Sequence, residues 1–142
     1  TPPPQPPAPQ PPSLQKPAPQ QPSPSQGIYG VWHLRWNIGK VQYESILIMQ
    51  GDSGGTRTVY FDPAVDQQVS IDQDMQLVVL AEGIFLTGSN PRFSKTNKPY
   101  TNYSPDNFAL QPQQNGPVQV IKICDVAGNC ADVQSEFLRE TP

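Results

Sequence analysis

The 142-residue chain has very few of the side chains that most catalytic and metal sites require. It contains one histidine, His33, and two cysteines, Cys124 and Cys130. A serine or cysteine nucleophile needs a neighbouring base, and zinc needs three or four protein ligands. We therefore expect no catalytic residue, no metal site and no cofactor, and we interpret the protein as non-enzymatic.

Charge and long apolar runs are also scarce. Charged residues make up 15% of the chain, and 9 basic against 12 acidic residues give a formal net charge of −3. This mild acidity argues against nucleic acid as a partner. No apolar run approaches the ~20 residues that span a bilayer, so we expect no direct membrane insertion by this fragment. No signal peptide is present, and we expect Thr1 to mark an artificial or processing boundary of a monomeric domain in a longer chain.

Residues 1–26 lack aromatic side chains and contain 12 of the 19 prolines. Leu14 is their only large apolar residue, so the segment has too little apolar surface to offset the entropy of ordering. Proline also favours an extended polyproline II backbone of ~3.1 Å per residue. The composition predicts a disordered Pro/Gln-rich spacer, with a docking peptide for SH3 or WW modules as the alternative.

From residue 27 onward, apolar side chains alternate with polar ones. Trp32, Leu34 and Trp36 share one face of the first candidate strand, opposite His33 and Arg35. Such alternation is typical of strands with one buried face. In the next three strands it predicts that the inward residues are Val41, Tyr43, Leu47, Met49, Val59, Phe61, Val69, Ile71, Met75, Leu77 and Val79.

The whole pattern predicts one all-β domain over residues 27–142. About seven or eight short strands, separated by Gly, Asn, Asp and Pro turns, indicate an antiparallel barrel or sandwich. Short connections favour an up-and-down meander for the first three strands. The tail over residues 132–140 is compatible with one short helix that turns Val133 and Phe137 inward.

The segment QGDSGGT, residues 50–56, matches the loop around the nucleophilic serine of chymotrypsin-like proteases. The partners that this serine needs are missing, because no aspartate lies between His33 and the motif and His33 is expected on the solvent face. We therefore interpret the match as coincidental and Ser53 as an ordinary turn residue.

The same segment is interpreted as a five-residue hairpin loop whose two adjacent glycines take positive φ angles. A loop of that length places Leu47 opposite Val59 and Ser45 opposite Phe61. Both pairs then lie on the face that the alternation assigns to the interior.

Cys124 and Cys130 flank the turn sequence DVAGN. A hairpin there brings the two Cα atoms within reach of a disulfide, which would stabilise the fold by about 2–3 kcal/mol. Free thiols, or a metal or redox role, are the alternatives. A disulfide would place the domain outside the reducing cytosol, as a periplasmic, secreted or membrane-tethered protein.

The tripeptide Gly30-Val31-Trp32 on the first strand resembles the GxW motif of lipocalin-like (calycin) barrels. The resemblance implies a barrel whose floor is closed by Trp32, with Arg139 packed on that ring. It also implies one possible function, the carriage of a small apolar ligand inside the barrel, lined by Trp32, Trp36 and Tyr43.

The longest segment without regular alternation is residues 88–106. Loops of this length are often functional, and cations interleaved with aromatic rings suit contact with sugars or acidic groups. The expected contact residues are Arg92, Phe93, Lys95, Lys98, Tyr100 and Tyr103. The alternative is a solvated loop whose rings pack back onto the sheet.

These observations favour a non-catalytic, extracytoplasmic binding or accessory module that contacts a protein or polysaccharide. The lipocalin-like carrier is the second hypothesis. A secreted protease inhibitor is the third, and it fits the size of the domain but has no residue signature.

Overall fold

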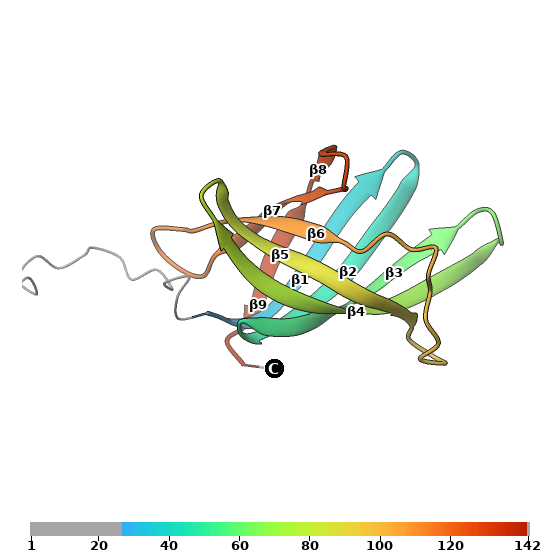
Figure 1. The fold of residues 1–142 in the computed structure, drawn as a ribbon, viewed down its shortest axis with the longest axis horizontal. Helices are drawn as coiled ribbons and strands as arrows, with labels where there is room; N and C mark the ends of the chain where they lie inside the picture. Colours follow the sequence, from blue (N-terminus) through green and yellow to red (C-terminus); the bar gives the residue numbers. More distant parts are fainter. Residues whose placement is uncertain (1–26, 142) are drawn as a thin grey trace, which may run out of the picture.

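The computed structural model describes residues 27–141, and within this range the protein is all-β with no helix (Figure 1). Nine antiparallel strands form one sheet in the order β8-β7-β6-β5-β4-β3-β2-β1-β9. The strands are β1 (Ile28–Ile38), β2 (Val41–Gly51), β3 (Ser53–Asp62), β4 (Gln67–Leu80), β5 (Gly83–Phe93), β6 (Asn107–Gln111), β7 (Gln119–Cys124), β8 (Cys130–Asp132) and β9 (Gln134–Arg139). The predicted all-β fold class is confirmed. The predictions for residues 1–26 lie outside the described residues.

The sheet curls into a nearly closed barrel. Strands β1 to β8 are neighbours in chain order, and β9 returns to pair with the free edge of β1. Val133, between β8 and β9, donates its N–H to the carbonyl of Ile121 on β7 at 3.0 Å, which brings the two ends of the sheet together. The expected meander is therefore extended to eight strands, and β9 covers an edge that would otherwise be exposed.

Large side chains fill the interior of the barrel. Trp32, Leu34 and Trp36 are all buried, as the alternation on β1 predicts. The cluster also contains Ile28, Leu47, Met49, Met75, Leu77, Leu86, Phe108, Leu110, Val118, Val120, Ile123 and Val133. At the end of β4, Val79 is 54% exposed, so its predicted inward position is wrong.

The predicted register of the β2–β3 hairpin is wrong. Leu47 lies opposite Thr56 and Ser45 opposite Thr58, because the turn contains only Gly51 and Asp52. Gly51 has φ 86°, as a two-residue hairpin turn that begins with glycine requires. The positive φ therefore occurs at Gly51 rather than at the adjacent glycines of the motif.

The shorter turn exchanges the two faces of β3. Thr56, Thr58 and Tyr60 point inward, whereas Phe61 is 51% exposed and Val59 is half-buried. The hydroxyl groups of Thr58 and Ser45 lie 3.0 Å apart and satisfy each other in the interior. Buried hydroxyls are tolerated when they are paired in this way, whereas the buried Thr56 hydroxyl has no partner among residues 27–141.

Gly54 lies inside strand β3, where a glycine is unusual, and the close approach of β2 explains it. A Cβ atom at Gly54 would collide with the Ile48 carbonyl oxygen and approach Met49 Sδ to 2.7 Å. Strand β3 can therefore pack this closely on β2 only without a side chain at that position. Ser53 precedes it as the exposed first residue of β3, opposite Gln50.

The tail forms strand β9, so the predicted helix is wrong. Phe137 lies opposite Trp32, and the two rings make an edge contact with centroids 5.2 Å apart. Trp32 Nε1 also donates to the Val118 carbonyl at 3.3 Å. The ring that packs on Trp32 is thus Phe137, while Arg139 is exposed opposite Val31.

Candidate functional site

The predicted contact loop is shorter than expected, because β5 continues to Phe93 and only residues 94–106 form a connection. This connection is held to the sheet by backbone hydrogen bonds. The Ser94 N–H donates to Ser70 at 2.9 Å, the Tyr100 N–H to Pro91 at 2.9 Å and the Gly88 N–H to Asp106 at 2.9 Å. The loop therefore folds back along β5 and positions its aromatic side chains against the barrel.

Six aromatic rings form a continuous row at this end of the barrel, which we call the aromatic row. Trp36, Tyr43 and Tyr60 are cross-strand neighbours on β1, β2 and β3. Their ring centroids are 5.5 Å and 4.8 Å apart. The row continues from Tyr60 through Tyr103, Tyr100 and Phe93 with centroid distances of 6.1, 5.9 and 4.4 Å. Such spacings are favourable for aromatic pairs.

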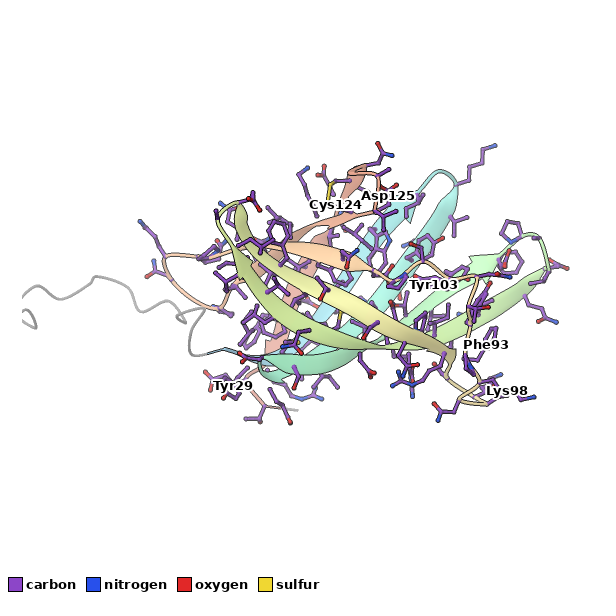
Figure 2. The ribbon with its side chains drawn as sticks, in the orientation of Figure 1. Tyr29, Phe93, Lys98, Tyr103, Cys124 and Asp125 are labelled. Atoms are coloured by element: carbon purple, nitrogen blue, oxygen red, sulfur yellow. A yellow bond between two sulfur atoms is a disulfide. The ribbon has the colours of Figure 1, made fainter. Side chains whose placement is uncertain are left out.

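Five of these rings line a pocket of about 520 Å³, which we call the aromatic pocket. They are Trp36, Tyr43, Tyr60, Tyr100 and Tyr103. The hairpin that carries Cys124, Asp125 and Cys130 forms the other wall. Figure 2 shows this hairpin above Tyr103, at the end of the barrel away from Tyr29. The pocket therefore joins side chains from β1, β2, β3, the 94–106 loop and the β7–β8 hairpin.

Asp106 supplies a buried carboxyl group to the pocket wall. Gln73 Nε2 on β4 donates to Asp106 Oδ2 at 2.7 Å, and the Asp106 N–H donates to Gln73 Oε1 at 2.9 Å. The Tyr103 hydroxyl donates to the same carboxyl group, 3.0 Å from Oδ1 and 3.1 Å from Oδ2. Burial raises the pKa of Asp106 to about 6, an effect that these hydrogen bonds partly oppose. The group is therefore mostly ionised at neutral pH despite its burial.

Three tyrosines of the pocket, Tyr43, Tyr60 and Tyr103, have raised pKa values and remain neutral near pH 7. Burial, followed by the nearby Asp106 carboxyl, raises the pKa of Tyr103 and of Tyr43. Burial and the hydrogen bond with Tyr100 raise the pKa of Tyr60. The rings thus offer uncharged faces and hydroxyl groups to a ligand.

The predicted disulfide between Cys124 and Cys130 is present. It spans the β7–β8 hairpin, where the two cysteines are directly paired. The Asp125 carboxyl accepts hydrogen bonds from the N–H groups of Ala127 at 3.0 Å and Asn129 at 2.8 Å, and these bonds lower its pKa. The disulfide and this turn together fix the second wall of the pocket.

The predicted contact residues do not form one surface, because only two of the six line the aromatic pocket. Tyr100 and Tyr103 line the aromatic pocket, and Phe93 stacks on Tyr100 outside it. Arg92 is not a free cation, since its Nη1 lies 3.2 Å from Asp74 Oδ1 on β4. Lys95 and Lys98 are exposed, and Figure 2 shows Lys98 at the tip of the loop, away from Tyr103.

The three residues expected to line a barrel floor also lie in two different places. Trp36 and Tyr43 line the aromatic pocket, whereas Trp32 is buried at the other end beside Val118. Sequence reasoning missed Tyr60, because the wrong register turned it outward. It also missed Asp106, since nothing in the local sequence distinguishes a buried aspartate from a turn aspartate.

A larger hollow of about 740 Å³ lies on the outer face of β2–β5. Its two carboxylates are already paired, Asp72 with Arg57 at 2.8 Å and Asp74 with Arg92 at 3.2 Å. The Arg57 hydrogen bond holds the pKa of Asp72 below its usual value. Despite its volume, this hollow offers a ligand no unpaired charge and no aromatic wall, so we favour the aromatic pocket.

The remaining sequence motifs add no further site. Ser53 lies opposite Gln50 on β2, whereas His33 lies opposite Ile46 and 3.8 Å from Glu44. Between residues 27 and 141, no group of three His, Cys, Asp or Glu side chains is placed to hold a metal ion, and no helix could cross a membrane. No family model, curated protein or solved structure matches the chain.

Proposed function

We propose that the domain is a non-catalytic binding module that takes a sugar unit of a polysaccharide into the aromatic pocket. The observation that carries this proposal is the convergence of five aromatic rings on one hollow of about 520 Å³. Small-ligand sites are usually hollows of ~300–1,000 Å³ with apolar or aromatic walls and a few polar groups. The C–H groups on one face of a pyranose ring pack well on an aromatic ring.

The polar groups of the pocket support a ligand with hydroxyl groups. Trp36 Nε1–H is buried and has no acceptor among the described residues, whereas the Asp106 carboxylate is an acceptor. A hydroxyl group can donate to this carboxylate, so a sugar can use it. Three exposed amide side chains in the lining add further partners, and these are Asn37, Asn102 and Asn129.

The packed interior favours this proposal over a lipocalin-like carrier. A carrier needs an enclosed apolar space, but Leu34, Met49 and Phe108 are fully buried and occupy the centre of the barrel. The hollow at the loop end is instead lined by aromatic rings together with amides, hydroxyls and two carboxyl groups. Lys95 and Lys98 lie outside it and would contact only a longer partner.

We also propose an extracytoplasmic location, periplasmic or secreted. The Cys124–Cys130 disulfide is compatible with an oxidising compartment, where such bonds persist. A polysaccharide ligand would be encountered in the same compartments.

Isothermal titration calorimetry of the full chain against soluble oligosaccharides tests the proposal. Tyr100→Ala removes one wall of the pocket and should weaken binding by about tenfold, the equivalent of one aromatic stacking contact. Tyr29→Ala is the matched control, because Tyr29 is 63% exposed at the opposite end of the barrel, and its affinity should equal that of the native chain. Equal losses in both variants, or no binding by the native chain, would overturn the proposal.

A further inference from the structure

The aromatic pocket contains a carboxylate with unused hydrogen-bonding capacity. An ionised carboxylate offers about four acceptor positions. Asp106 receives one hydrogen bond from Gln73 Nε2 and one from the Tyr103 hydroxyl, whose single proton is shared between the two oxygens. Two acceptor positions therefore remain on a carboxylate that is only 7% exposed and lines the pocket.

Within residues 27–141, no cationic side chain pairs with this carboxylate. Three other aspartates of the barrel lie beside cations, and these are Asp72 with Arg57, Asp74 with Arg92 and Asp132 with Lys122. The described residues that line the aromatic pocket include Asp106 and Asp125 but no lysine, arginine or histidine. Burying a charge without a partner is costly, so the cost is reduced if a bound ligand supplies the cation.

The walls of the pocket favour a cation as well. Trp, Tyr and Phe rings attract cations over their faces, and the attraction increases when the cation is desolvated. Trp36, Tyr43 and Tyr60 form such a wall in β1, β2 and β3, and Tyr103 joins the wall to Asp106. An ammonium group has three donors and no acceptor, which matches the free acceptor positions of Asp106.

We propose that the aromatic pocket selects amine-bearing sugar units, that is, hexosamines with a free, protonated amino group, over neutral, N-acetylated and acidic sugars. This inference rests on the proposed function, because the sugar ring still packs on the aromatic wall. The ammonium group lies at Asp106.

Three β-1,4-linked glucose-based oligosaccharide series test the selection, because they differ only at C2, which carries a hydroxyl, an acetamido or an ammonium group. At pH 7 the ammonium series should bind the full-length native chain about tenfold more tightly than the other two, which corresponds to one hydrogen bond between the ammonium group and the Asp106 carboxylate. Asp106→Asn should lose this preference while still binding all three series.

The net charge of −3 attracts any cationic oligomer to this chain, so a charge control is required. Glu82→Gln removes one exposed carboxyl group at the β4–β5 turn, outside the pocket lining, and should retain the preference. A preference that persists unchanged in Asp106→Asn would overturn the inference, because it would arise from overall charge. Equal binding of the three series would overturn the inference and leave the proposed function intact, whereas no binding of any series would overturn both.

The native chain provides a second readout that does not depend on the variant's folding. Acidification from pH 7 to pH 5 protonates Asp106, whose pKa is about 6, while it makes the sugar amine more charged. The groups that act on Asp106 are Gln73, which does not titrate, and Tyr43 and Tyr103, whose pKa values are raised so that their phenols stay neutral. The other carboxyl group of the lining, Asp125, has a lowered pKa and keeps its charge over this range, so it does not cause the change. The preference should therefore fall severalfold at pH 5; a preference that is constant or rises would contradict the role of Asp106.

Discussion

Gln73 and Asp106 exchange two hydrogen bonds inside the barrel wall, with Nε2 donating to Oδ2 at 2.7 Å and the Asp106 N–H donating to Oε1 at 2.9 Å. The pair links the middle of β4 to the end of the 94–106 loop. It therefore fixes both the Asp106 carboxyl group and the adjacent Tyr103 at the aromatic pocket. A functional group that is held from two sides in this way keeps its geometry without a ligand.

The raised pKa of Asp106 predicts an unusual dependence of stability on pH. Since its pKa is about 6 in the folded protein against an ordinary 3.8, the folded state binds the proton more tightly than the unfolded state. The contribution of this group to stability is therefore greatest below about pH 4, declines as the pH rises to about 6, and is constant above that. The total change is on the order of 3 kcal/mol.

Asp106→Asn removes this pH-dependent contribution. The free energy of unfolding of the variant minus that of the native protein should therefore increase as the pH is raised from 4 to 7.5. Urea unfolding of both proteins at the two pH values measures the gain. Aspartates with lowered pKa values, such as Asp72 and Asp132, act equally in both proteins and cancel in the difference. A variant that is less stable by the same amount at both pH values would show that the pKa of Asp106 is not raised.

Gly54→Ala tests the observed register of β2 and β3. The new Cβ would meet the Ile48 carbonyl oxygen and Met49 Sδ, so we expect a loss of about 1–3 kcal/mol in the free energy of unfolding. Gly39→Asn is the control, because a Cβ there meets nothing within 4 Å and asparagine tolerates the φ of 61°. If both variants unfold at the native denaturant concentration, Gly54 lies in a loop and the register is different.

Reduction of the Cys124–Cys130 disulfide should affect both stability and binding. The bond closes a short loop with a sequence separation of 6, for which chain entropy gives about 2 kcal/mol. The hairpin also forms one wall of the aromatic pocket, so oligosaccharide affinity should fall with it. Intact mass before and after reduction checks the bond itself, with an expected difference of about 2 Da. If the mass does not change on reduction and the chain still binds normally, the disulfide is absent and binding does not require it.

The sequence predicted the fold well where side chains alternate in size. On β1, Trp32, Leu34 and Trp36 differ so much from His33 and Arg35 that the buried face is evident, and the structure confirms it. On β3 the inward residues are Thr56, Thr58 and Tyr60, whereas Val59 and Phe61 point outward, so both faces carry polar and apolar side chains. Alternation alone cannot identify a face that buries hydroxyl groups, of which Thr58 pairs with Ser45 on the next strand and Thr56 has no partner among the described residues.

The sequence assigned four aromatic residues of the candidate site to two different predicted sites. Tyr100 and Tyr103 were expected in a contact loop, and Trp36 and Tyr43 in a barrel lining, but only the fold brings them together at one pocket. The importance of Asp106 depends on a partner 33 positions away, Gln73. Long-range pairing of this kind leaves no local signal in the sequence.

The two tryptophans give the most direct test of the aromatic pocket. Each indole N–H produces one signal in an ¹H–¹⁵N correlation spectrum, and the two can be assigned with Trp32→Phe and Trp36→Phe. Trp36 lines the pocket, and its Nε1–H has no acceptor among the described residues. Trp32 Nε1–H, in contrast, donates to the Val118 carbonyl. On addition of the amine-bearing oligosaccharide, we predict that the Trp36 signal shifts and the Trp32 signal does not. A shift of Trp32 alone, or of neither signal at saturating ligand, would contradict binding in the aromatic pocket.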